Sequence, residues 1–277
     1  MKEQYTLIFL TLLVRLGLGT LVVYIIARSL FFNTSEVLVT FLALATTTSG
    51  LALSLFHLGK PGRILNSFSN LKSAMSWEAI IAPLALISIF SLVLVSYFYE
   101  SSSWIVPLRM IVLIFSLAFI FVTGKVYHLR ARPSWNTPLV VYEYFVSTII
   151  FGIVGLTSIH YIVGNLTAEL SKTIGFVLLV LLALEAIITY AFRARAIKAT
   201  VTAEKALSSK KNKSLYTNFI IVGLIIPFAM AISLLMNTDY IMFAPAILVP
   251  FFIGAILWRI IFFRSATLIK ITPDIKI

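Results

Sequence analysis

The sequence contains no cysteine and only three histidines. Without cysteine the chain can form no disulfide, no thiolate nucleophile and no cysteine-ligated iron–sulfur cluster. Three histidines cannot ligate two haems, and no two of them share a predicted span at haem-ligating spacing. No P-loop, zinc motif or hydrolase elbow is present. If electrons pass through this protein, they must therefore leave by a cofactor that a partner holds.

Charge is also scarce. Charged residues make up 12% of the 277 residues, hydrophobic residues make up 60%, and the mean hydropathy is +1.04. A soluble domain has about 25% charged and about 45–50% apolar residues. Apolar runs of about 20 residues, long enough to cross a bilayer as a helix, recur along the chain. The sequence therefore predicts an all-α polytopic membrane protein, with residues 1–277 forming a single transmembrane domain.

Eight transmembrane helices are predicted, at approximately Tyr5–Phe31, Val37–Phe56, Glu78–Phe98, Trp104–Gly124, Leu139–Val163, Lys172–Phe192, Tyr216–Met236 and Ile241–Phe263. An even number places both termini on one side of the membrane, here called side A. The loops 57–77, 125–138 and 193–215 lie on the same side and are predicted to face a partner. The basic loop 193–215 is expected to be mobile in part and to contact lipid or the partner.

The basic residues divide unequally between the two sides. Eighteen of the 22 lysines and arginines fall on side A, counting Arg259 with the C-terminal tail, whereas only Arg28 and Lys172 fall on side B. This positive-inside bias predicts that side A, with both termini, faces the cytoplasm across the cytoplasmic (inner) membrane. Because the net charge of +12 lies in loops between spans, we expect it to contact the lipid bilayer or a partner, and we expect no nucleic-acid binding.

Four ionisable residues lie near or within the spans of the side-A half: Arg15, Glu78, Glu143 and Glu185. A charge in the bilayer core costs about 2.5–3.5 kcal/mol on insertion scales, so each one requires a physical reason. Together they predict a polar pocket that opens toward side A. The structural alternatives are that Arg15 only pairs with Glu185, that Glu143 stays hydrated at the interface, and that Glu78 only favours the helix dipole, with Ser76 as the cap.

Other polar and aromatic residues are expected at the two membrane interfaces. Arg109 is predicted to snorkel toward side B, and His160 is predicted to be an interface residue there. His128 is expected either to contact headgroups or to belong to the polar pocket. Tryptophans at 77, 104 and 135 fall where aromatic belts occur.

The hairpin that begins at His57 combines groups suited to proton transfer. Imidazole titrates near neutral pH and can accept a proton, the Arg63 guanidinium can orient an oxygen anion, and Glu78 can accept the proton next. A proton acceptor at the membrane edge beside an apolar cavity is what quinol oxidation requires. From the chemistry alone, a structural hairpin or a transport gate remains open.

Two motifs in this region resemble those of a known family. The first is His57-Leu58-Gly59-x-Pro61-x-Arg63 followed by Ser73-x-x-Ser76-x-Glu78. The second is Tyr127-x-Leu129-Arg130-x-Arg132-Pro133-x-Trp135-Asn136-Thr137-Pro138. Both resemble the membrane-anchor subunit of dimethyl sulfoxide reductase, the DmsC-like family of molybdopterin oxidoreductase anchors. The eight-helix layout is similar over the whole chain.

The resemblance implies an anchor that binds no cofactor or metal of its own. It implies oxidation of menaquinol and electron delivery to a four-cluster iron–sulfur subunit, which passes the electrons to a catalytic subunit with a molybdopterin cofactor in anaerobic respiration. In this family the histidine matching His57 takes part in quinol oxidation, and the residues matching Arg63 and Glu78 lie near the quinol. Gly59 and Pro61 belong to the same motif. The second motif implies a docking face, to which we assign Arg130, Arg132, Trp135 and Asn136.

Three quinol-site candidates come from the residues alone and not from the resemblance: Arg15, Glu143 and Glu185. Two rival functions remain open. A small-solute transporter predicts broken helices near mid-membrane and an inverted repeat, and no clear inverted repeat is present. A purely structural anchor predicts that loss of His57 leaves turnover intact.

Overall fold

The computed structural model describes residues 2–30, 34–57, 70–99, 102–236 and 241–266, without the side chains of 2–4 and 54–57. Every regular element in these ranges is helical, and eight of the helices are long and apolar enough to cross a membrane. The prediction of an all-α, eight-span membrane protein is confirmed. The elements are α1 (Lys2–Ile26), α2 (Glu36–His57), α4 (Ala74–Phe98), α5 (Ile105–Val126), α6 (Leu139–Ile162), α7 (Ala168–Ala199), α8 (Val201–Ser208), α9 (Lys210–Asn218), η2 (Phe219–Ile225), α10 (Ile226–Met236), α11 (Phe243–Ala246) and α12 (Leu248–Arg264).

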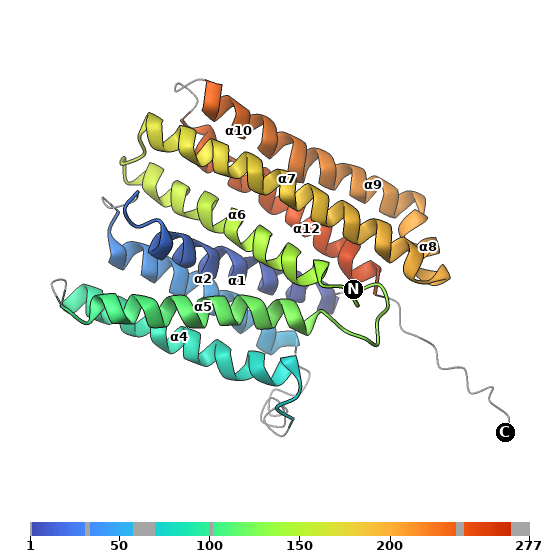
Figure 1. The fold of residues 1–277 in the computed structure, drawn as a ribbon, viewed down its shortest axis with the longest axis horizontal. Coiled ribbons are helices and arrows are strands. Elements are labelled where there is room, and N and C mark those ends of the chain that lie inside the picture. Colours follow the sequence, from blue (N-terminus) through green and yellow to red (C-terminus); the bar gives the residue numbers. More distant parts are fainter. Residues whose placement is uncertain (1, 31–33, 58–69, 100–101, 237–240, 267–277) are drawn as a thin grey trace.

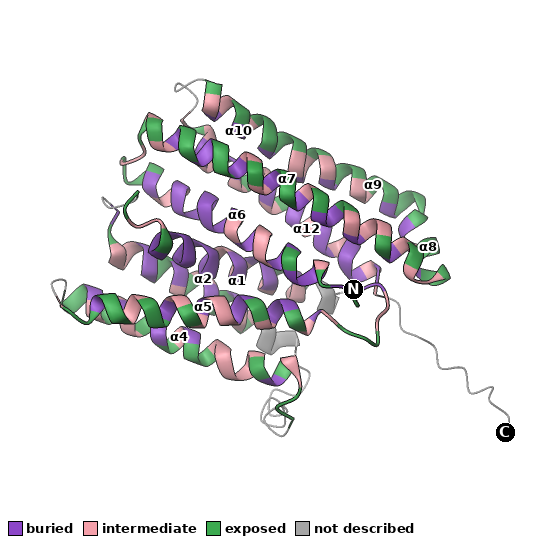
Figure 2. Cartoon of the chain, in the orientation of Figure 1, coloured by how far each residue is buried: buried purple, intermediate pink, exposed green. Residues whose placement is uncertain are grey.

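Helices α1 and α6 form the centre of the bundle. Figure 1 shows α4 and α5 together on one flank and α7 with α10 on the other. In the most apolar stretch of each span, 83% of the residues of α1 and 72% of those of α6 are buried, whereas the share is 28–44% in the other spans. The outer helices accordingly carry most of the exposed residues in Figure 2. Polar residues on α1 and α6 are therefore enclosed by protein and shielded from lipid.

A glycine crossing brings α1 and α6 into close contact. A Cβ atom added to Gly19 would lie 2.1 Å from the Thr148 carbonyl oxygen, and one added to Gly152 would lie 2.2 Å from the Gly19 oxygen. Small residues allow membrane helices to pack through their backbones in this way. Because both helices start on side A, the crossing also brings Arg15, one turn before Gly19, next to the first turns of α6.

The start of α4 differs from the predicted start. Ser73 caps the helix by accepting a hydrogen bond from the Met75 amide at 3.2 Å, whereas the Ser76 hydroxyl donates to the Asn70 carbonyl at 2.7 Å. The alternative of Ser76 as the cap is wrong. Glu78 is the fifth residue of α4 and does not open it.

The segment 193–215, predicted to be a loop, is mostly helical. Helix α7 continues to Ala199, and Thr200 and Ser209 then cap the short helices α8 and α9. Ala203 and Leu207 are buried, and the Arg193 guanidinium lies 4.3 Å from the centre of the Tyr216 ring. At 1.5 Å per residue the 32 residues of α7 span about 48 Å, longer than the hydrocarbon core of about 30 Å. This region therefore forms a helical projection at side A, as Figure 1 shows.

Candidate functional site

A buried ion pair joins α1 to α6. Arg15 donates to both carboxylate oxygens of Glu143, at 3.0 and 3.1 Å, and to the Ser147 hydroxyl at 2.5 Å. Arg15 is 1% exposed and Glu143 is 3% exposed. The expectation of a polar site in this half therefore has a structural basis, although the direct partner of Arg15 is Glu143. The alternatives that Arg15 pairs with Glu185 and that Glu143 stays hydrated are wrong.

A second arginine approaches the same carboxylate from α12. The Arg259 Nη2 atom lies 3.4 Å from Glu143 Oε2, and the side chain is fully buried. The Tyr144 ring contacts both cations, because its centre lies 3.9 Å from the Arg15 Cζ atom and 5.4 Å from the Arg259 Cζ atom. Placing Arg259 in the side-A tail was an error, since it lies inside the last span.

Glu185 brings a fourth charged group, from α7. It is 3% exposed and lies within electrostatic range of Glu143 and Arg15. Its Oε2 atom has no hydrogen-bond partner among the described residues. Arg15, Glu143, Glu185 and Arg259 are called the buried charged cluster below. With both carboxylates ionised its formal charge is zero, which makes its burial in an apolar bundle tolerable.

A small pocket lies beside this cluster, between α1, α2, α4, α5 and α6. Its volume of about 10 Å³ holds roughly one water molecule. We call it the Glu78 pocket, and it is lined by Leu10, Thr11, Val14, Leu51, Glu78, Phe119, Thr123 and Tyr144. Tyr144 belongs to both the pocket and the surroundings of the cluster. Leu51 lies six residues before His57 on α2, or about 9 Å along the helix axis.

The structure brings some of the predicted quinol-site residues together and does not describe the others. It brings Arg15, Glu143 and Glu185 together and puts Glu78 in the adjoining pocket. His57 is the last residue of α2, and its side chain lies outside the description. Gly59, Pro61 and Arg63 also lie outside the described residues. In the described ranges, no three histidine, aspartate or glutamate side chains are grouped so that they could hold a metal ion.

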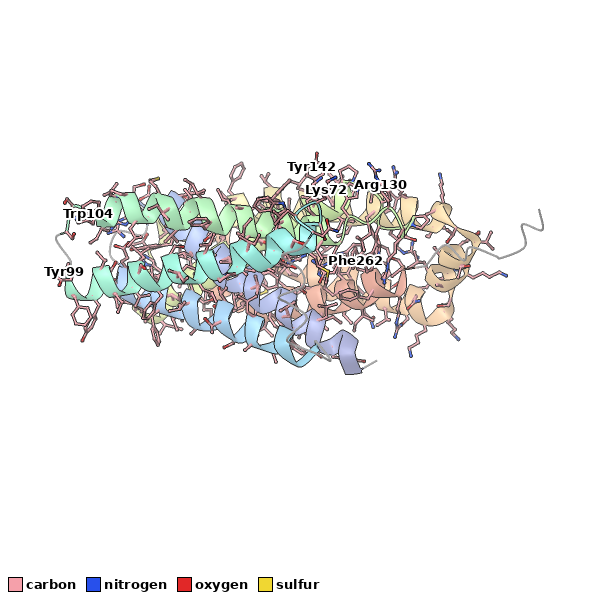
Figure 3. All side chains as sticks on the ribbon, turned by 90° about the horizontal axis from the view of Figure 1, so that it is seen from below. Lys72, Tyr99, Trp104, Arg130, Tyr142 and Phe262 are labelled. Atoms are coloured by element: carbon pink, nitrogen blue, oxygen red, sulfur yellow. The ribbon has the colours of Figure 1, made fainter. Side chains whose placement is uncertain are left out.

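Trp135 fastens the second motif to the bundle. Its indole stacks on Phe262 at 4.5 Å, and its Nε1 atom donates to the Phe262 carbonyl at 3.2 Å and to the Ser265 hydroxyl at 3.1 Å. It is 3% exposed, so it lies neither in an aromatic belt nor on a docking surface, and both of those expectations are corrected. Trp104, by contrast, is 72% exposed, at the opposite end of the molecule from Arg130 in Figure 3.

The other residues expected to dock a partner are accessible to different degrees. Arg130 and Asn136 are exposed, and the Asn136 carbonyl accepts a hydrogen bond from Arg195 at 3.4 Å. Arg132 is half-buried, with its guanidinium 4.5 Å from the centre of the Trp135 ring. The bond from Arg195 ties the motif loop to the side-A projection, so the two form a continuous basic surface.

Tyr127, at the start of the second motif, lies beneath this surface. It is 7% exposed, and its ring meets those of Trp135, Phe262 and Phe263 edge-on. Burial raises the pKa of the Tyr127 phenol well above its ordinary value, and the nearby Glu78 carboxylate acts in the same direction. The phenol therefore stays protonated at physiological pH and can serve only as a neutral hydrogen-bonding group.

The side-B half contains a separate set of polar contacts. Arg109 donates to both oxygens of Glu36, at 2.6 and 2.5 Å, and Arg28 lies 3.4 Å from the same carboxylate. His160 is 2% exposed, with its Nδ1 atom on the Thr34 hydroxyl. Arg109 is therefore ion-paired at side B, the side toward which it was predicted to snorkel, whereas His160, expected at the interface, is buried. These contacts tie α2, α5 and α6 together at side B.

Sequence reasoning missed Arg259, Tyr144 and Ser147. Arg259 could have been recognised as a buried charge, because it lies within the last apolar run, five residues before Arg264, and Arg264 alone is enough to end the span. Ser147 also had one, since it is four residues after Glu143 and such residues share a helix face. Tyr144 carried no signal of its own, because tyrosine is common near membrane interfaces.

Comparison with known proteins gives two matches. A family model described as DMSO reductase anchor subunit (DmsC) matches residues 1–264. The C subunit of the anaerobic dimethyl sulfoxide reductase of Haemophilus influenzae is 26% identical to this protein over 160 residues. That match covers 54% of this protein and 56% of the relative, so the two match over about half the length of each. Both motif segments, 57–78 and 127–138, lie within the range of the family model.

Proposed function

Because this protein belongs to the DmsC family of DMSO reductase anchor subunits, we propose that it oxidises menaquinol and feeds a membrane-bound molybdopterin reductase complex. The electrons pass to an iron–sulfur subunit and then to a catalytic subunit with a molybdopterin cofactor. The complex lies in the cytoplasmic (inner) membrane and supports anaerobic respiratory electron transport. The protein itself is a multi-pass membrane protein whose role in the reaction is to bind quinol and handle its protons.

The observation that carries this proposal is a carboxylate-lined pocket within an apolar bundle. Glu78, Thr123 and Tyr144 are the polar groups that line it, together with Thr11, and the remaining walls are apolar. The pocket lies along α2, the helix that ends at His57. Quinol oxidation needs this combination, because the ring hydroxyls must lose protons while the isoprenoid tail stays in lipid. At about 10 Å³ the pocket has room for a water molecule and not for a quinol ring, so the proposed position of the ring is outside the pocket, between it and the end of α2.

Each motif residue has a role in this reaction. Oxidation of one menaquinol yields menaquinone, two electrons and two protons. His57 accepts the proton of the first hydroxyl to ionise, and Arg63 stabilises the oxygen anion that this leaves. Gly59 and Pro61 belong to the same motif and are assigned to the quinol site with it. Glu78 takes the proton from His57 and returns it to the water in the pocket.

The buried charged cluster adjoins the Glu78 pocket at Tyr144. Arg15 and Glu143 lie next to Tyr144, Glu185 lies within electrostatic range of both, and all three are buried, so their field acts without contact with the lipid. In a low-dielectric bundle, such a field acts more strongly on a developing quinol anion than it would in water. These three residues belong to the quinol site as its polar wall.

The partner docks on side A. The exposed Arg130 and Asn136, with the half-buried Arg132, form one part of the basic surface, and the helical projection 193–215 forms the other. Trp135 contributes indirectly by holding the loop on α12. Because the motif hairpin and this surface share side A, electrons reach the iron–sulfur subunit without crossing the bilayer.

Glu78→Gln is expected to lower the turnover driven by a menaquinol analogue by about 10²-fold, since a positioned proton acceptor contributes roughly 10²–10⁴-fold. Reduction of the same complex by dithionite, which needs no quinol site, should be unchanged. Glu169→Gln, at an exposed glutamate in the first turn of α7 and outside the proposed docking surface, is the matched control and should behave as wild type. Full quinol-driven turnover in Glu78→Gln would remove this residue from the proton path.

A further inference from the structure

The buried charged cluster and its neighbour Tyr144 contain polar atoms that the protein does not satisfy. Among the described residues, no hydrogen bond is formed by Arg15 Nε, Tyr144 Oη, Glu185 Oε2 or the three Arg259 nitrogens, of which Nη2 has only its ion-pair contact with Glu143 at 3.4 Å. Each of these side chains is at most 3% exposed. A buried polar group without a partner costs about 1–3 kcal/mol. Five of these atoms have neither a hydrogen bond nor an ion-pair contact, which indicates that another molecule occupies this region of the bundle.

The balance of donors and acceptors identifies that molecule. Four of the six atoms belong to the two arginines, and all four can only donate. Glu185 Oε2 is the one carboxylate oxygen among them, so donors outnumber acceptors. Water can accept from the guanidinium groups and donate to Glu185. Internal waters of proteins make about three such bonds each.

Tyr144 connects this region to the Glu78 pocket. Its hydroxyl is one of the unpartnered groups, the centre of its ring lies 3.9 Å from the Arg15 Cζ atom, and it lines the pocket together with Glu78. The pocket has room for roughly one water molecule. Polar groups therefore follow one another from Glu78 on α4, through Tyr144 on α6 and Arg15 on α1, toward Glu185 on α7.

We propose that internal water molecules link the Glu78 pocket through Tyr144 to Glu185, and that Glu185 holds a proton released by quinol oxidation. This inference rests on the proposed function. When menaquinol becomes menaquinone, its two electrons leave to the iron–sulfur partner and its two protons leave the hydroxyls. One proton goes to His57, and the other passes along the water chain to the Glu185 carboxylate.

The charged groups around Glu185 suit it to gain and lose a proton. Arg15 on α1 and Glu143 on α6 both lie within electrostatic range of its carboxyl group, so a cation and an anion face it inside the bundle. Arg259 acts through Glu143, because its guanidinium pairs with that carboxylate and offsets part of its charge.

The test uses the assembled complex in membranes and a water-soluble menaquinol analogue as the reductant. In the infrared difference spectrum between oxidised and quinol-reduced wild type, a protonated-carboxyl band should appear and should be missing in Glu185→Gln. Quinol-driven turnover of Glu185→Gln should be about 10-fold slower than that of wild type, and its solvent isotope effect should be larger. The loss is smaller than the ~10²-fold loss expected on removing a direct base, because water still conducts protons. Glu185→Asp should restore the band.

Glu169→Gln is the matched control, because Glu169 is an exposed glutamate in the first turn of the same helix. It should keep the band, the rate and the isotope effect of wild type. If Glu185→Gln also keeps the band and the isotope effect while the complex oxidises quinol, the inference is wrong and the proposed function stands. If wild type oxidises no quinol although dithionite reduces it, both are wrong. Loss of assembled complex in Glu185→Asp and Glu185→Gln alike would assign Glu185 a structural role and overturn the inference.

Discussion

Replacing His57 with alanine is expected to abolish menaquinol-driven reduction of the complex while the protein remains assembled in the membrane. His57 is the first proton acceptor in the proposed reaction, and no other histidine lies on α2 or α4 to replace it. The rate should fall by about 10²–10⁴-fold, the range typical of a lost general base. The measurement is steady-state turnover with a menaquinol analogue, normalised to the amount of assembled complex. Reduction by dithionite should stay at the wild-type level.

His128→Ala is the matched control for this substitution. His128 is a half-buried histidine of the side-A loop that follows α5, so its replacement removes the same chemical group from the same side. Quinol-driven turnover of His128→Ala should stay within about twofold of wild type, because His128 lies outside the proposed proton path. Normal turnover in His57→Ala would instead favour a purely structural anchor. Equal losses per assembled complex in both variants would mean that loss of either side-A histidine lowers turnover, and would contradict a specific role for His57.

Replacing Glu143 with leucine is expected to destabilise the bundle by about 3–5 kcal/mol, the usual cost of removing one partner from a buried ion pair. The substitution takes away both carboxylate acceptors of Arg15 and the carboxylate that pairs with Arg259. Within the cluster, two guanidinium groups would then be balanced only by the single carboxylate of Glu185. The change is measured as the loss in free energy of unfolding of the purified protein in detergent, followed by helix content.

Combining Glu143→Leu with Arg15→Met should recover part of this loss. The double variant removes one charge of each sign, and apolar replacement of a complete buried pair is often neutral. Tyr142→Leu, at an exposed position beside Glu143, controls for the change in side-chain size and should be close to wild type. A Glu143→Leu protein as stable as wild type would show that the ion pair does not hold α1 against α6.

The membrane topology could be predicted because it depends on local composition alone. Eight apolar runs of sufficient length gave eight spans, and the alternation along the chain fixed which of the loops share a side. Helix ends were less predictable where capping decided them. Ser73 and Ser76 are both plausible caps by sequence, and only the hydrogen bond from Met75 to Ser73 distinguishes them. The helices within 193–215 were missed because they are too short and too basic to show a membrane-like pattern.

The composition of the site could be predicted only in part, since the cost of burying charge identifies candidates but not their partners. Arg15, Glu143 and Glu185 were found because each interrupts an apolar run. Their pairing depends on the close crossing of α1 and α6 at Gly19 and Gly152, which no local pattern encodes. The burial of Trp135 was missed for the same reason, because its partner Phe262 lies 127 residues further along the chain.

The central claim is that electrons from quinol enter the complex through this protein. It is tested most directly by mixing the assembled wild-type complex in membranes with a reduced menaquinol analogue and following the iron–sulfur signal by electron paramagnetic resonance. We expect the clusters to become reduced to the extent that dithionite reduces them. Clusters that dithionite reduces but the quinol analogue leaves oxidised would contradict the account.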